Sequence, residues 1–190
     1  MQMLITSLRI AAVTIAVCVV GYSAVILGVA QLTTPETAEG SLITTADGRI
    51  LGSRLIAQGF TEPGYFWPRP SAVNYNAAAA GGSNKSPTSD DLTKRAKTLL
   101  ARYGATRDNP LPPELAAASG SGLDPHISEH AARYQAARVA SARGLPLNEL
   151  EALIGQCAFA PGGVLTPDRV VNVLALNLAL DRLSGQQANE

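Results

Sequence analysis

Cysteine and histidine are scarce in this sequence, with two of each among 190 residues. Cys18 lies inside an apolar segment and Cys157 far beyond it, so the two cannot pair, which excludes an exported fold held by disulfides. His126 and His130 have a spacing at which one helix face could present both to a metal, but no Glu follows the first His and no third ligand is evident. We therefore expect two surface histidines and no metal site.

An excess of charge is also absent, because fifteen Lys and Arg residues balance fifteen Asp and Glu. With no basic run to bind a polyanion, nucleic acid is excluded as a partner. The sequence has no Gly-x-x-x-x-Gly-Lys-[Ser/Thr] loop, no Rossmann glycine pattern and no Asp-Lys-Thr-Gly-Thr phosphorylation sequence. This chain alone is therefore not expected to hydrolyse nucleotide.

One long apolar segment is present near the start. No charged residue occurs from Ile10 to Pro35, and Ile10–Leu32 is rich in Ala, Val, Ile and Leu. As a helix this stretch is about 34 Å long, enough to cross the ~30 Å hydrocarbon core of a bilayer. A cleaved signal peptide ending near Ala30 is the alternative, but its apolar region would run only about 7 to 15 residues. We expect a membrane anchor in residues 1–34 and one soluble domain in residues 35–190.

The charges that flank the anchor predict its orientation. Arg9 precedes the span, whereas Glu36 and Glu39 follow it. Because positive flanks stay in the cytoplasm, the N-terminus is expected inside and the soluble domain on the periplasmic or external side.

The pattern of the soluble part predicts an α+β fold, rich in helix, with a small β-hairpin sheet. Strands are expected in Ser41–Thr45 and Arg49–Gln58, joined at Asp47-Gly48, which is a strong hairpin signal. Helices are expected at Asp90–Tyr103 and Ser128–Arg143, each followed by a glycine that can end it.

Two further helices are expected toward the C-terminus. Asn148 and Glu151 form a variant capping box for a short helix that reaches about Cys157. Thr166-Pro167-Asp168 is expected to begin the last helix. Its Val and Leu residues are too many for one stripe, so that helix should be buried on most sides.

The densest cluster of polar and flexible residues runs from Ser119 to Ser128, directly into a helix N-terminus. Free backbone N–H groups at such a junction can bind an anion. The alternative is a tight structural loop, capped by Asp124 and Ser128, in which glycines supply positive φ. A hydrolase with Ser119 or Ser121 as nucleophile, Asp124 and His126 is disfavoured, because triad members usually come from separate elements and no Gly-x-Ser-x-Gly motif is present.

A second region of interest lies in Phe60–Ser89, a loop that holds five of the nine aromatic residues and is too aromatic to be disordered. Its segment Tyr65–Ser71 combines rigid prolines, a guanidinium and amphipathic aromatics, a composition typical of a protein contact surface. The alternative is that these aromatics belong to the core.

Several specific blocks occur in order along nearly the whole chain: Gly52-Ser53-x-Leu55-Ile56-x-Gln58, Tyr65-Phe66-Trp67-Pro68-Arg69-Pro70-Ser71, Asn74-Tyr75-Asn76, Gly81-Gly82-Ser83-Asn84, Ser119-Gly120-Ser121-Gly122-Leu123-Asp124-Pro125-His126-Ile127-Ser128, Gln135, Arg138-Val139-Ala140, Arg143-Gly144 and Val171-Asn172-Val173-Leu174-x-Leu176-Asn177-Leu178-Ala179-Leu180. With the apolar anchor, these blocks resemble the C subunit of the Kdp high-affinity potassium-transporting ATPase of bacteria and archaea. Ala80, Lys85 and Glu129 depart from the family pattern. Cys157–Asp168 diverges, so nothing is carried over there.

The resemblance implies a non-catalytic subunit of an ATP-driven potassium importer in the bacterial inner membrane. Its implied partners are a channel-like potassium-translocating subunit, a P-type ATPase subunit and a small single-span peptide. The family is described as a catalytic chaperone that raises the ATP affinity of the ATPase subunit. A purely structural or gating subunit, which caps the potassium-entry face without nucleotide contact, is the alternative. ATP with Mg and potassium would be handled by the complex, with no cofactor held tightly by this chain.

The resemblance also implies two sets of contact residues and no catalytic ones. Nucleotide or partner contact is expected from Ser119, Gly120, Ser121, Gly122, Asp124, His126, Gln135 and Arg138. Partner contact is expected from Tyr65, Trp67, Arg69, Ser71, Asn74, Tyr75, Asn76, Ser83 and Asn84. Direct nucleotide contact conflicts with the expected topology, because ATP is cytoplasmic and the charge flanks put the domain outside.

Overall fold

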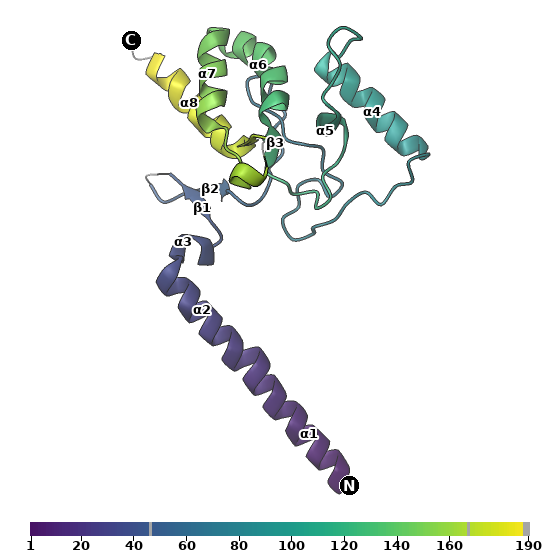
Figure 1. Ribbon diagram of the computed structural model, residues 1–190, viewed down its shortest axis with the longest axis vertical. Helices are drawn as coiled ribbons and strands as arrows, with labels where there is room; N and C mark the ends of the chain where they lie inside the picture. The colour runs from purple at the N-terminus through teal and green to yellow at the C-terminus, as the bar shows by residue number, and fades with distance from the viewer. Residues whose placement is uncertain (46, 167, 188–190) are drawn as a thin grey trace. The chain divides into compact units, whose positions relative to one another are not determined.

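The computed structural model describes residues 1–45, 47–166 and 168–187 of the chain (Figure 1). The chain divides into two compact units, Met1–Leu51 and Gly52–Glu190. The proposed division into residues 1–34 and 35–190 stays a prediction.

The first unit begins with one continuous helix, Gln2–Thr33, of mean hydropathy 2.5. It comprises α1 (Gln2–Thr14), the π-helical segment η1 (Ile15–Gly21) and α2 (Tyr22–Thr33). This helix is long and apolar enough to cross a membrane, and it contains the whole of the predicted span. The single anchor expected from the sequence is therefore present in the fold.

A short helix and a hairpin follow the anchor. They are α3 (Pro35–Ala38), β1 (Leu42–Thr44) and β2 (Ile50–Ser53), and the two strands form a two-stranded sheet. Gly48 has φ +80° in the turn, as the Asp-Gly signal predicts. The second strand ends at Ser53, earlier than expected, because the chain turns there and the hydroxyl of Ser53 accepts from the Leu55 amide.

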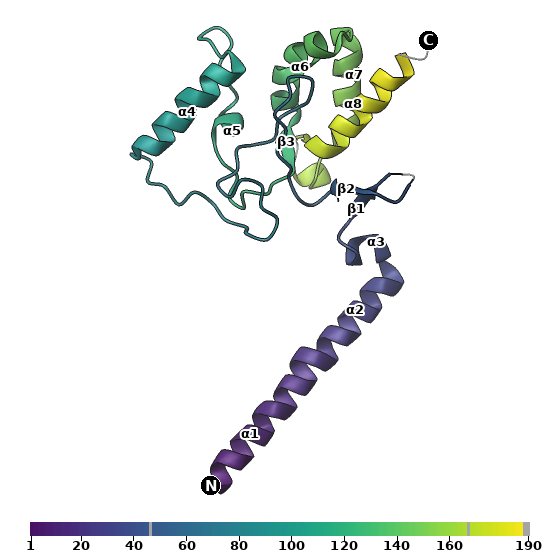
Figure 2. The same ribbon diagram turned by 180° about the vertical axis from the view of Figure 1, so that it is seen from behind.

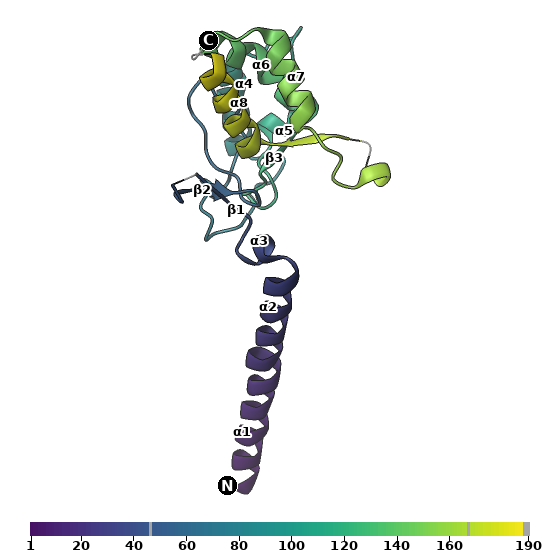
Figure 3. The same cartoon turned by 90° about the vertical axis from the view of Figure 1, so that its left-hand side faces the viewer.

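The second unit contains α4 (Asp90–Tyr103), α5 (Pro113–Ala116), α6 (Glu129–Arg143), α7 (Leu147–Cys157) and α8 (Val173–Gln187), with a second small sheet. In this sheet β3 (His126–Ser128) pairs antiparallel with β4 (Val170–Asn172). Before β4 the chain runs out to a 3-10 turn, η2 (Gly163–Leu165), apart from the helices (Figure 3).

The predictions for α4 and α6 are confirmed at both ends. The hydroxyl of Ser89 accepts from the Asp91 amide at the start of α4, and the hydroxyl of Ser128 accepts from the Ala131 amide at the start of α6. Gly104 and Gly144 end the two helices in the left-handed conformation.

The starts predicted for the other two helices are wrong. Helix α7 begins at Leu147 after Pro146 with no side-chain cap, so the capping box of Asn148 does not form. Thr166 does not begin the last helix, and Pro167 lies outside the described residues. Instead Val170–Asn172 pairs with β3, a long-range contact that satisfies its backbone, and α8 starts at Val173.

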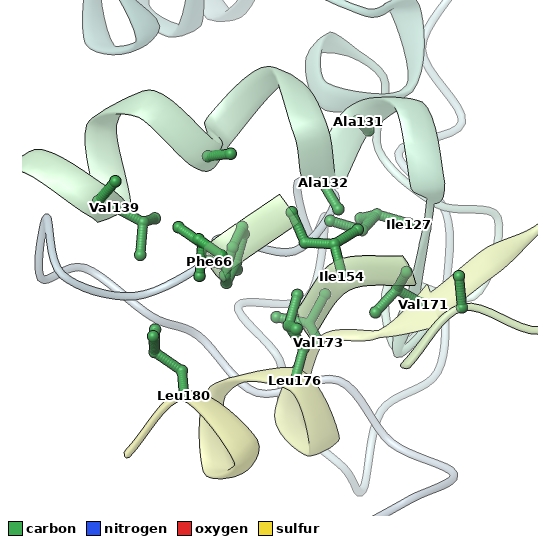
Figure 4. Packing of buried hydrophobic residues seen from close by; sticks show 14 of the residues in the cluster. Phe66, Ile127, Ala131, Ala132, Val139, Ile154, Val171, Val173, Leu176 and Leu180 are labelled. Carbon is green, nitrogen blue, oxygen red and sulfur yellow. The ribbon is translucent and has the colours of Figure 1, made fainter. Parts of the chain in front are cut away.

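The core lies where α6, α7 and α8 pack against β3 and β4 (Figure 2). Ile127, Val139, Ile154 and Leu176 are almost fully buried and come from β3, α6, α7 and α8 in turn (Figure 4). Phe66, from the aromatic loop, is also fully buried among them. The aromatic segment is therefore in part core, whereas α4 has no buried residue and packs on α5.

Candidate functional site

The two candidate regions of the sequence lie against each other in the structure. The amide of Gly81 donates to the Ser121 carbonyl at 2.7 Å, and the amide of Ser119 donates to the Pro70 carbonyl at 3.2 Å. Backbone bonds thus join residues 65–84 to residues 119–126. We call the surface formed by these two segments the composite surface.

Gly122 is required by this close packing. It has φ +70°, and a Cβ there would lie 2.7 Å from the Val73 side chain and 2.8 Å from the Gly81 carbonyl oxygen. Ser119 is buried, and the hydroxyl of Ser121 accepts from the Leu123 amide. The glycines and serines of the block therefore serve as a tight structural loop, while Gly120 and Ser121 themselves remain exposed.

Asp124 links the two segments through one carboxylate oxygen and fixes its own loop through the other. Oδ2 lies 3.2 Å from Nη1 of Arg69, and Oδ1 accepts from the His126 amide at 3.0 Å. The imidazole of His126, whose Nδ1 lies 3.6 Å from Oδ1, lowers the pKa of Asp124, and the His126 amide and Arg69 act in the same direction. The His126 ring also packs edge-on against Phe159.

Asp124→Asn is expected to reduce the loss of unfolding free energy that the parent chain shows as the pH falls. Because folding lowers the pKa of Asp124 below its unfolded value of about 3.9, its contribution is present above that pH and is lost as pH falls through the folded pKa. The side chain is one-third exposed, so solvent screening limits the loss at neutral pH to about 0.5–1 kcal/mol. Unfolding in urea, followed by the fluorescence of Trp67, measures this. The prediction is contradicted if Asp124→Asn lowers the free energy of unfolding by the same amount at pH 7 and at pH 2. It is also contradicted if the exposed control Asp108→Asn shows the same dependence on pH.

Two buried side-chain amides hold the backbone of the aromatic segment. Gln135 on α6 accepts from the Trp67 amide at 2.9 Å and donates to the Trp67 carbonyl at 3.0 Å. Asn177 on α8 does the same for Phe66, at 2.8 and 3.0 Å. Each amide satisfies both backbone groups of one residue, as a neighbouring strand would. Gln135 and Asn177 are each 1% exposed, so these bonds are shielded from water.

Arg138 supports the same segment. Its Nη2 donates to Oε1 of Gln135 at 2.7 Å, and its Nη1 donates to the carbonyls of Pro63 and Tyr65. Its Cζ lies 3.6 Å from the ring centroid of Trp67. Burial lowers the pKa of Arg138 to about 10, so the guanidinium stays protonated at neutral pH. Gln135 and Arg138, both expected to contact a nucleotide or partner, thus hold Trp67 in place.

The remaining candidate residues divide into structural and exposed groups. The hydroxyl of Ser71 accepts from the Tyr75 amide, and the Tyr75 hydroxyl donates to the Arg69 carbonyl, both at 2.9 Å. Ser83 is half-buried. The exposed candidates are Asn74, Asn76 and Asn84, and among these Asn74 and Asn84 have positive φ, which asparagine tolerates better than most residues. Ala78, which was not among the candidates, is exposed in the same loop. These positions, with the exposed Gly120 and Ser121, are available to a partner on the composite surface.

A pocket next to the composite surface was not predicted from the sequence. Its volume is about 190 Å³, and α4 contributes Leu99, Arg102 and Tyr103 to it. The other lining residues come from the aromatic loop and α5: Phe60, Trp67, Pro68, Pro70, Ser71, Tyr75 and Leu115. The spacing of Leu99, Arg102 and Tyr103 on one helix face is the signal that could have suggested it.

The long apolar helix and the small α+β unit that carries the composite surface define the class of this protein, which is a single-pass, membrane-associated protein.

A family model described as "KdpC: K+-transporting ATPase, c chain" matches residues 4–182. A "Potassium-transporting ATPase KdpC subunit" of Parvibaculum lavamentivorans is 64% identical over 183 residues, which cover 96% of this chain and 98% of that one. The Myxococcus xanthus protein of the same name is 47% identical, covering 95% and 88%.

The chain therefore belongs to the KdpC family, the c chains of K+-transporting ATPases. The resemblance inferred from the ordered blocks is confirmed by this match.

Proposed function

We propose that this chain is a non-catalytic subunit that assembles and stabilises an ATP-driven potassium import complex. Its soluble domain docks on the channel-like potassium-translocating subunit through the composite surface. The observation that carries this proposal is the interlocking of residues 65–84 with residues 119–126 by backbone hydrogen bonds. A loop fixed in this way loses little conformational entropy on docking, so a larger share of its contact energy goes into binding. The P-type ATPase subunit and the small single-span peptide complete the proposed assembly.

The proposed orientation puts the N-terminus in the cytoplasm and the domain outside the bacterial inner membrane. Arg9 before the span and Glu36 and Glu39 after it support this direction. Any effect on the ATP affinity of the complex is then indirect and passes through assembly. The position of Gln135 agrees with an indirect effect, because its side chain is 1% exposed and both of its polar atoms are bonded to Trp67.

Orientation provides the test, because ATP is present only inside the cell. A single cysteine at Ser121, which is exposed, is introduced into a chain in which Cys18 and Cys157 are replaced by serine. We expect a membrane-impermeant thiol reagent to label it in intact cells with a permeabilised outer membrane. A cysteine at Gln2, which precedes the predicted span, is the control and should react only after the inner membrane is lysed. If Ser121→Cys is labelled only after the inner membrane is lysed, the proposed function is refuted and direct nucleotide contact becomes the favoured hypothesis.

A further inference from the structure

The pocket between α4 and the aromatic loop has the size and lining of a site for one side chain. At about 190 Å³ it lies below the roughly 300–1,000 Å³ of sites that enclose drug-sized ligands or cofactors. Its walls are aromatic and prolyl, with Arg102 as the one charged lining residue. Burial raises the pKa of Tyr103 to about 12 and also raises that of Tyr75, so both phenols stay neutral.

Trp67, at the pocket wall, is held between two guanidinium groups. The Cζ of Arg102 lies 3.8 Å from its ring centroid and that of Arg138 lies 3.6 Å from it. Two planar guanidinium groups this close to one centroid cannot share a face of the ring without overlap, so they stack on opposite faces. Tyr103 packs edge-on against the same ring, at 5.2 Å between centroids.

Neither arginine has a carboxylate partner within the described part of the chain. The cations of the ion pairs found there are Arg69, Lys85, His126, Arg133, Arg143 and Arg169. Nε of Arg138 is buried without a hydrogen-bond acceptor, whereas Nη2 of Arg102 donates only to a carbonyl, that of Phe60. The side chain of Arg138 is half-buried, whereas Arg102 is exposed, so Arg102 is the guanidinium that a carboxylate from outside can reach. Two cations without a carboxylate partner flank one ring and leave an excess of positive charge at this pocket.

We propose that an acidic side chain from another subunit of the complex inserts into this pocket and pairs with Arg102. A guanidinium fork binds a carboxylate with two parallel hydrogen bonds, and the rings of Trp67 and Tyr103 pack against the methylene groups of the incoming chain. An aromatic pocket with an arginine at its edge is the usual setting of an interface hot spot. This inference rests on the proposed function, for which it supplies the chemistry of one contact.

The variant Arg102→Glu tests the proposal in the whole complex, isolated through a tag on this chain. We expect the co-isolated partner subunits to fall at least about tenfold, the lower end of measured couplings between close charge pairs. Arg102→Lys keeps the charge without the fork and should give an intermediate loss. Lys97→Glu is the matched control, because it makes the same charge change at an exposed position of α4 that does not line the pocket. Recovery of Arg102→Glu equal to that of Lys97→Glu would overturn the proposal.

A photoreactive amino acid at Leu99, inside the pocket, decides the matter even if Arg102→Glu disturbs packing. The proposal expects a cross-link to a peptide of another subunit with Asp or Glu at or beside the attachment site. A cross-link to lipid, to nucleotide or to a peptide without an acidic residue would overturn it. A chain cut to residues 1–51 distinguishes failure of the proposed function from failure of the pocket contact. If the cut chain assembles like the full chain, the proposed docking by the soluble domain is wrong. If the cut chain does not assemble but Arg102→Glu does, the docking stands and only the proposed pocket contact is wrong.

Discussion

Replacement of Gln135 by Leu is expected to lower the free energy of unfolding by about 3 kcal/mol. The change leaves the amide and carbonyl of Trp67 without partners in a site where water does not reach, at a cost of about 1–3 kcal/mol for each group. Arg138 loses an acceptor at the same time. For a unit of this size the midpoint of thermal unfolding should fall by on the order of 10 °C.

The emission of Trp67, the single tryptophan, measures this loss and should also shift to longer wavelength in the folded state of the variant. Gln156→Leu is the matched control, because Gln156 is exposed on α7, and it should change stability by no more than about 0.5 kcal/mol. Asn177→Leu should cost about as much as Gln135→Leu, since it removes the equivalent pair of bonds to Phe66. A Gln135→Leu chain that unfolds like the parent, but whose complex needs more ATP for half-maximal hydrolysis, would instead assign Gln135 to nucleotide contact.

The sequence predicts well those elements whose signals are local. Helices α4 and α6 each carry a serine cap before the first turn and a glycine after the last, so both could be placed within one residue. The hairpin turn at Asp47-Gly48 is local in the same sense. The anchor needed only composition, because a bilayer requires a long uncharged stretch.

What could not be predicted depends on contacts between distant residues. The sequence predicts helix where strand β4 lies, because the pairing of β4 with β3 joins residues more than forty positions apart. The bonds of Gln135 to Trp67 span 68 residues, and those of Asn177 to Phe66 span 111. No periodicity or short motif reports such contacts. Gln135 could be singled out from the sequence, but its burial and its two bonds to Trp67 could not be inferred.

The candidate site shows the same division. The Ser-Gly block and the aromatic segment were each identified by composition, whereas their interlocking through Gly81 and Ser121 is visible only in the fold. The pocket of Arg102 was missed because its walls come from three separate segments of the chain.

Ala78→Arg is expected to prevent docking while leaving the fold intact. Ala78 is exposed in a turn in which the Asn76 side chain accepts from its amide, so a longer side chain points to solvent and should cost the isolated chain no more than about 0.5 kcal/mol. In a packed interface the same arginine is a bulky charge without a partner, which should weaken association at least about tenfold. Ala137→Arg makes the same change on the exposed side of α6, outside the composite surface, and should assemble normally.

The most direct measurement is the amount of the other subunits that co-purifies with each full-length variant, with potassium-limited growth of the same cells as the functional readout. The account predicts loss of both for Ala78→Arg and for the chain cut to residues 1–51, and retention of both for Ala137→Arg. Normal assembly and growth with Ala78→Arg, in a chain that folds like the parent, would contradict docking through the composite surface.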